Sequence, residues 1–173
     1  MFTWNFVYGD EADQIYLLSG VRITCSPKAK PDITWLMSRM EELNVPPAYL
    51  AELEEIRFTR LRNRDHGDYF AGRIRLSVSK ESWPNVDRTL IHELAHHVDD
   101  LDEITLDDRL DAERKRNGHH MPDQYARRNV GEYLAVGFEV YYLGTKEEKS
   151  RMRKMNPLLF RTIRNIHRRY QKR

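Results

Sequence analysis

The stretch TLIHELAHHVD, from Thr89 to Asp99, is the part of the sequence around which the rest is organised. Within it, His92 and His96 stand four residues apart, so on an α-helix both imidazoles leave the same face, one turn apart. The residues around them favour such a helix, because an apolar stripe is formed by Leu90, Ile91, Leu94, Ala95 and Val98. Asn85, which follows a proline, is a candidate N-cap for this helix.

Two imidazoles with this spacing can hold one Zn²⁺, each at about 2.0–2.1 Å. Glu93 is the next residue after His92, and its carboxylate can accept a proton from a metal-activated water, which is the chemistry of the H-E-x-x-H pattern. A shuffled chain of this composition would contain only about 0.02 such matches. The alternative is a surface helix with solvated histidines. The motif therefore indicates a metal site, and it indicates proteolysis less strongly.

Length and composition predict a single globular domain over residues 1–173, with an N-terminal α/β part over about 1–100 and a helical part over about 101–173. Apolar residues make up 40% of the chain and charged residues 32%. Cys25 is the one cysteine, which indicates a reducing compartment. The start of the sequence lacks the features of a secretion signal, and no apolar run approaches about 18 residues. We therefore expect a cytoplasmic protein without a membrane span, and non-classical export stays open.

The net charge of +2 conceals a basic C-terminal segment. Residues 145–173 contain eleven Lys and Arg against two Glu, a charge of +9, so the rest of the chain carries −7. Such a segment suggests nucleic acid, an acidic partner, or the chain's own acidic stretch after residue 98 as its counterpart. A solvated helix face is the simpler interpretation.

The N-terminal half is predicted to form strands around one helix. Phe2–Tyr8 alternates like a half-buried strand, and Ile15–Cys25 is a second β-like stretch with a bend at Gly20. Asp32 is predicted to cap a helix that continues to Leu43. Ile56–Arg60 alternates again and predicts another strand.

A further strand is predicted over Phe70–Val78, just before the histidine motif. Arg73 and Arg75 on its outer face are the kind of charge that protects a sheet edge. An edge strand beside the metal could pair with an extended peptide. His66, before this strand, is interpreted as a turn residue rather than a ligand.

The C-terminal half reads as helical. A charged helix is predicted from about Leu106 to Asn117, followed by a loop with His119 and His120, a pair that we rank low as ligands. A second helix runs from Asn129 to a stop at Gly144, and a last helix begins after Pro157.

A catalytic zinc site usually has three protein ligands, so one more is required. Asp102 stands ten residues after His92, but a ligand there needs a sharp glycine turn, and the turn position holds Asp99. Glu132 is the better candidate, in the first turn of a helix that can pack on the histidine helix. Its alternative role is a capping box with Asn129. Glu139, two turns later, is the fallback ligand.

The stretch Tyr125–Phe138, taken with His92–Asp99, resembles the catalytic domain of the anthrax lethal-factor group of zinc peptidases, which includes the Pro-Pro endopeptidases. The shared pattern is H-E-x-x-H followed by a tyrosine, an asparagine, and a glutamate seven residues after the tyrosine. The resemblance implies that Glu132 is the third zinc ligand. It also implies that the Tyr125 hydroxyl stabilises the oxyanion or helps to protonate the leaving group.

Together these observations predict an α+β protein with a compact zincin-like fold: a small mixed sheet with an antiparallel edge strand, an active-site helix and a helical C-terminal half. The expected function is zinc-dependent hydrolysis of a peptide or protein substrate, with Glu93 as the general base. Two alternatives remain. One is a basic nucleic-acid-binding module, and the other is an interaction protein that zinc stabilises without catalysis.

Overall fold

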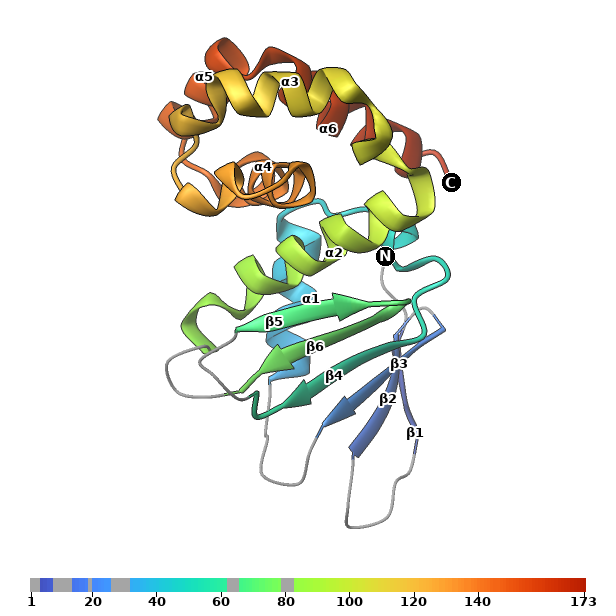
Figure 1. Ribbon diagram of the computed structural model, residues 1–173. Helices are drawn as coiled ribbons and strands as arrows, with labels where there is room; N and C mark the ends of the chain where they lie inside the picture. The colour runs from blue at the N-terminus through green and yellow to red at the C-terminus, as the bar shows by residue number, and fades with distance from the viewer. Residues whose placement is uncertain (1–3, 8–13, 19, 26–31, 62–65, 79–82) are drawn as a thin grey trace.

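The computed structural model describes residues 4–7, 14–18, 20–25, 32–61, 66–78 and 83–173. A mixed β-sheet lies at one end, and helices stack on one of its faces in successive layers (Figure 1). The predicted α+β class is therefore confirmed, including the mixed sheet with an antiparallel edge. Phe2 and Tyr8, the ends of the first predicted strand, lie outside the described residues.

The described residues form a six-stranded sheet in the order β1-β2-β3-β4-β6-β5. Its strands are β1 (Trp4–Val7), β2 (Gln14–Leu18), β3 (Val21–Cys25), β4 (Glu55–Thr59), β5 (Gly67–Phe70) and β6 (Arg73–Ser77). The central strands β3, β4 and β6 are parallel, whereas β1, β2 and β5 each pair antiparallel to a neighbour. Their alternating side chains explain the core: Ile56, Phe58, Ile74 and Leu76 are buried.

Two strand predictions were wrong in detail. The stretch Ile15–Cys25 forms two strands, because Gly20 takes a φ of +90° that reverses the chain rather than bending it. The stretch Phe70–Val78 also contains a turn, at Ala71 and Gly72, where φ is again positive. Its arginine-bearing part, β6, lies between β4 and β5, so the edge next to the histidine helix is β5. Arg75 on β6 binds Asp68 of β5 rather than guarding an open edge.

Six α-helices occur among the described residues. They are α1 (Ile33–Glu42), α2 (Val86–Asp102), α3 (Asp108–Asn117), α4 (Val130–Leu143), α5 (Lys146–Met155) and α6 (Pro157–Tyr170). Asp32 caps α1 as predicted, since its Oδ1 accepts a hydrogen bond from the Trp35 amide at 2.8 Å. Asn85 stands at the N-cap of α2 but makes no capping bond with its side chain. Helix α5 falls between the stop at Gly144 and Pro157, where we had predicted no element.

The layers of the fold bring α2 and α4 together. Helix α2 lies on the β5–β6 side of the sheet, α4 lies across α2, and the helices α3, α5 and α6 cover α4 (Figure 1). Residues of α4 are buried on nearly every side, including Tyr133, Ala135, Phe138 and Val140. The histidine helix is therefore held between the sheet and α4. No helix in the described part of the chain is both long and apolar enough to cross a membrane.

Candidate metal centre

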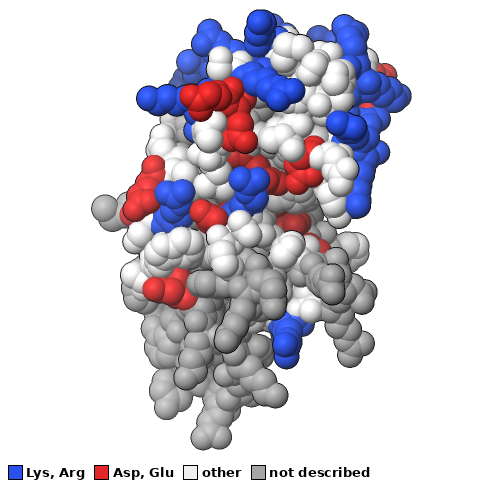
Figure 2. All heavy atoms as spheres, turned by 90° about the vertical axis from the view of Figure 1, so that its left-hand side faces the viewer, with Lys and Arg blue, Asp and Glu red and all other residues white. Residues whose placement is uncertain are grey.

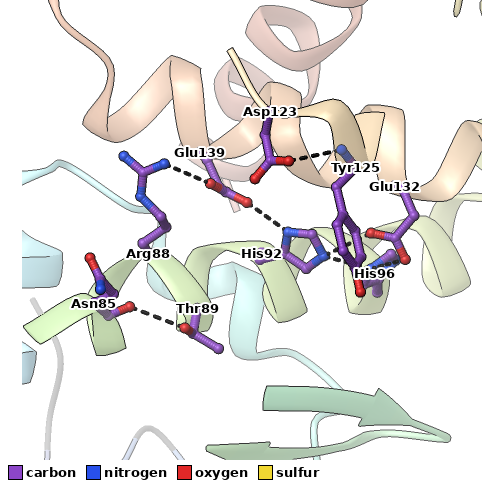
Figure 3. A network of polar contacts seen from close by, with 9 residues as sticks. All are labelled: Asn85, Arg88, Thr89, His92, His96, Asp123, Tyr125, Glu132 and Glu139. Carbon is purple, nitrogen blue, oxygen red and sulfur yellow. Dashed lines mark hydrogen bonds and ion pairs between the residues drawn. The ribbon is translucent and has the colours of Figure 1, made fainter. Parts of the chain in front are cut away.

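The ring nitrogens of the two motif histidines meet a carboxylate from α4 (Figure 3). His92 Nε2 lies 3.2 Å from His96 Nε2 and 3.1 Å from Glu132 Oε2. His96 Nε2 lies 3.8 Å from Glu132 Oε1. One ligand atom from each of these residues falls within 4.8 Å of the others, so the three residues could hold one metal ion.

These separations suit a small tetrahedral site. With metal–ligand bonds of about 2.0–2.1 Å, neighbouring ligand atoms in a tetrahedron lie about 3.3 Å apart. The closest pairs, at 3.1 and 3.2 Å, are near that spacing. Glu132 Oε2 is buried, and its close contact among the described residues is with His92 Nε2, at 3.1 Å. A cation between these atoms would satisfy the carboxylate together with both ring nitrogens. The donor set and the spacing of these atoms therefore fit a divalent metal.

The start of α4 explains how Glu132 reaches the histidines. Asn129 caps the helix by accepting a hydrogen bond from the Glu132 amide at 2.8 Å. The Glu132 side chain turns to His92 and His96, whereas the capping-box alternative required it to fold back on Asn129. Gly131 lies directly against the histidine helix, since a Cβ there would be in van der Waals contact with His96 Cε1, at 3.7 Å.

Glu139 lies behind His92 rather than beside the metal position. Its Oε1 is 2.7 Å from His92 Nδ1, and its Oε2 is 3.2 Å from the guanidinium of Arg88 (Figure 3). A carboxylate on Nδ1 fixes the tautomer that leaves Nε2 free to coordinate, and it raises the basicity of the ring. The fallback assignment of Glu139 as a ligand is thus replaced by an orienting role.

The carboxylates around His92 favour a positive charge in the centre. Burial lowers the pKa of the His92 imidazole, but contacts with Glu132 and Glu139 outweigh burial and raise the pKa to about 10. Glu132 responds in the opposite direction, since its contact with His92 lowers the pKa of the carboxyl. Either a proton or a metal cation can supply the charge that these carboxylates stabilise.

Glu93 is almost fully buried, with 6% of its surface exposed. Burial raises the pKa of its carboxyl to about 7, above the range of an exposed glutamate. The backbone of β5 passes directly beside it: a Cβ added at Gly67 would lie 3.2 Å from Glu93 Oε1 and 2.5 Å from Thr89 Cγ2. The absence of a side chain at residue 67 therefore keeps space next to this carboxylate.

Tyr125 lies in a short 3₁₀ turn, Gln124–Arg127, just before α4. The turn is capped by Asp123, whose Oδ1 accepts a hydrogen bond from the Tyr125 amide at 2.8 Å. The ring is 41% exposed and extends toward the His92–His96–Glu132 group (Figure 3). The guanidinium of Arg128 stacks on it, 3.6 Å from the ring centroid. The hydroxyl is thus presented at the surface of the site and not used for packing.

The other sequence candidates lie outside the His92–His96–Glu132 group. Helix α2 continues through Asp99 to Asp102, and Asp102 forms an ion pair with Arg169 of α6. His119 and His120 stack on each other, and within the described residues they belong to no group that could hold a metal. His66 is exposed and lines a hollow that also contains Arg88, His92 and Glu93, but it does not belong to the group that could hold a metal.

The site opens into two hollows that share His92, Glu93, Tyr125 and Gly67. One, of about 660 Å³, extends past His96 toward Asp99 and Glu103. The other, of about 550 Å³, extends past Thr89 toward Arg88 and Asp123. A cleft that is open on both sides of a reactive centre can accommodate the middle of an extended chain.

Sequence reasoning missed three features of this site: Gly67, Arg88 and the orienting role of Glu139. Two of them left a signal in their spacing. Arg88 stands four residues before His92 on one helix face, and Glu139 stands seven residues after Glu132, two turns along its own face. Gly67 left none, because its importance arises from the sheet passing over α2.

The chain matches no protein-family model, and no curated protein is similar to it. The resemblance to the lethal-factor group therefore rests on the motif residues alone.

Proposed function

We propose that the protein is a zinc-dependent endopeptidase. The observation that carries the proposal is the convergence of His92, His96 and Glu132 beside a buried Glu93 in an open cleft. Two histidines and a glutamate are a ligand set of catalytic zinc sites, which keep a fourth position for water or substrate. Zn²⁺ bound there would act as a Lewis acid that polarises a carbonyl oxygen and lowers the pKa of water.

The side chains around the ligands have the other catalytic and orienting roles. Glu93 accepts a proton from the attacking water and passes it to the leaving amine, and a pKa of about 7 suits a group that does both near neutral pH. The Tyr125 hydroxyl donates a hydrogen bond to the oxygen that becomes negative as the peptide carbonyl is attacked. Glu139 holds His92 in the coordinating tautomer.

Strand β5 is the candidate docking edge for the substrate. Among the described strands it pairs with β6 alone, and Gly67 at its start lines both hollows of the cleft. An extended peptide can add to such an edge through backbone hydrogen bonds, which would carry a central peptide bond past Glu93. We further propose that the fold is of the zincin type and that the resemblance to the lethal-factor peptidases reflects a shared chemistry.

Metal content and peptide cleavage together test this function. Purified protein should contain about one Zn²⁺ per chain, and His92→Ala or Glu132→Ala should remove it. A proteome-derived peptide library, read by mass spectrometry, should show internal cleavages with wild-type protein. Glu93→Gln should retain zinc and lose cleavage by more than the about 10²–10⁴-fold typical of one acid–base group, because Glu93 acts in two steps.

The outcomes separate the alternatives. Stoichiometric zinc in His92→Ala would place the metal elsewhere and overturn the centre. Zinc that depends on all three ligands, combined with no cleavage of any peptide, would reject the peptidase and leave a zinc-stabilised interaction protein.

A further inference from the structure

A separate hollow, of about 460 Å³, lies on the helical half and shares no residue with the two hollows of the metal centre. It is formed mainly by α4, α5 and α6, with the end of α1 beside them. Its lining comprises Leu43, Asn44, Tyr141, Tyr142, Lys149, Ser150, Arg153, Phe160 and His167. Rings form one part of this wall and cationic side chains another, and nothing in the proposed peptidase uses either.

The rings form a connected group around Tyr141. Its centroid lies 5.2 Å from that of Tyr142, 5.6 Å from that of His167 and 6.0 Å from that of Phe160. Tyr142 is buried and fixed by hydrogen-bond contacts with Tyr49 and His167. Tyr141 and Phe160 are only partly buried. These two rings therefore pack within an aromatic group and also contribute to the wall of the hollow.

The charges near these rings are positive. Lys149 and exposed Arg153 line the hollow, and Lys149 Nζ is held 3.4 Å from the carbonyl oxygen of Tyr142. Burial raises the pKa of Tyr141, and the nearby charges of Arg168 and Arg164 oppose that shift. Arg164 Nε is buried with no hydrogen-bond partner in the described part of the chain. None of the described residues that line the hollow is Asp or Glu.

The hollow belongs to a wider basic surface. Residues 145–173, which form α5 and α6, contain eleven Lys and Arg against two Glu. Figure 2 shows Lys and Arg side chains predominating at the top of the molecule, over the helical half. A surface of this charge attracts polyanions, and the hollow adds a place where a planar apolar group can be held.

We propose that this hollow binds single-stranded nucleic acid. Bases stack on Tyr141 and Phe160. The adjoining phosphates contact Lys149 and Arg153, which line the hollow, and Arg164 and Arg168, whose charges act on Tyr141. Aromatic platforms beside a basic track are how proteins hold single strands, because each nucleotide presents a π-face next to a negative charge. A duplex keeps its bases paired inside, and an acidic peptide matches only the charge, so neither uses the rings.

Fluorescence anisotropy of the full-length protein with a labelled oligodeoxythymidine of about 12 nucleotides, within the range of known single-strand sites, tests the proposal. Tyr141→Leu should weaken binding at least about fivefold, the lower end of the loss expected when one base–aromatic stack is removed. Tyr141→Phe keeps the ring and should bind like wild type. Thermal melting of each variant confirms that it is folded.

The charge contribution is read from the salt dependence. Arg153→Gln should reduce the slope of log affinity against log salt by about 0.7, the value for one phosphate contact on a single strand. Arg73→Gln is the matched control, because it removes one exposed arginine from the sheet and should leave the slope unchanged.

Three results would overturn the proposal. Equal binding by Tyr141→Leu and wild type would show an electrostatic attraction without stacking. A duplex that binds as tightly as the single strand would show the same. Polyglutamate that displaces the oligonucleotide at equal charge concentration would identify an acidic protein as the occupant. Because the readout involves neither zinc nor cleavage, failure here leaves the proposed peptidase untouched.

Discussion

The contact between Glu139 and His92 yields the sharpest prediction about the metal centre. Glu139→Gln keeps the shape of the side chain and an acceptor oxygen, but it removes the charge 2.7 Å from His92 Nδ1. A hydrogen bond to a charged group contributes about 1.5–3 kcal/mol, against about 0.5–1.5 kcal/mol for a neutral one. The difference of roughly 1–1.5 kcal/mol corresponds to about tenfold weaker zinc binding, at the lower end of the about 10–100-fold range for such supporting residues.

Competition with a chromophoric zinc chelator measures this change directly. Glu113→Gln is the matched control, since Glu113 is also a buried glutamate and accepts hydrogen bonds from the Leu158 and Leu159 amides at 2.9 Å. It should lower the free energy of unfolding and leave zinc affinity unchanged. Wild-type affinity in Glu139→Gln would refute the orienting role. Equal loss of affinity in both variants would reduce the effect to general stability.

Three further predictions address the cleft and its support. Tyr125→Phe should lower kcat by roughly 10–10³-fold with zinc content and KM nearly unchanged, because a hydroxyl that stabilises only the transition state does not affect ground-state binding. Wild-type turnover of a cleaved peptide by this variant would remove Tyr125 from the mechanism. Gly67→Ala should lower the free energy of unfolding, measured by chemical denaturation, by about 1–3 kcal/mol through overpacking against Thr89 Cγ2. Adding Thr89→Ser, which removes that methyl, should recover much of the loss, and purely additive effects of the two substitutions would contradict the contact. Tyr133→Phe should lower the free energy of unfolding by about 1–3 kcal/mol in the same assay, because the buried Asn156 Oδ1 loses the hydroxyl that lies 2.7 Å away. The zinc content of this variant should not change.

Some features of the site are local consequences of sequence. The apolar stripe around the histidine motif is sufficient to predict α2, and the 3.6-residue period then brings His92 and His96 to one face whatever surrounds the helix. The cap at Asp32 and the cap at Asn129 are equally local, since each side chain binds an amide three residues away. Helix α5 has an equally local signal, because Thr145 and Glu148 form a capping box at its start.

The distribution of roles among the carboxylates required the tertiary structure. Glu132 and Glu139 share a face of α4, and sequence spacing allowed either to be the third ligand. The crossing of α4 over α2 brings Glu132 to the Nε2 side of His92 and Glu139 to its Nδ1 side. Asp102 is directed to Arg169 only because α6 packs nearby.

Sequence patterns also could not predict which strand forms the edge of the sheet. Arginines on β6 are typical of an exposed edge, but β6 pairs on both sides and its Arg75 is matched by Asp68 on β5. Strand order depends on contacts between segments far apart in the chain, whose free energies are set by the packing of all layers at once. Local patterns therefore determined which residues form each element, and long-range packing determined which side chains meet.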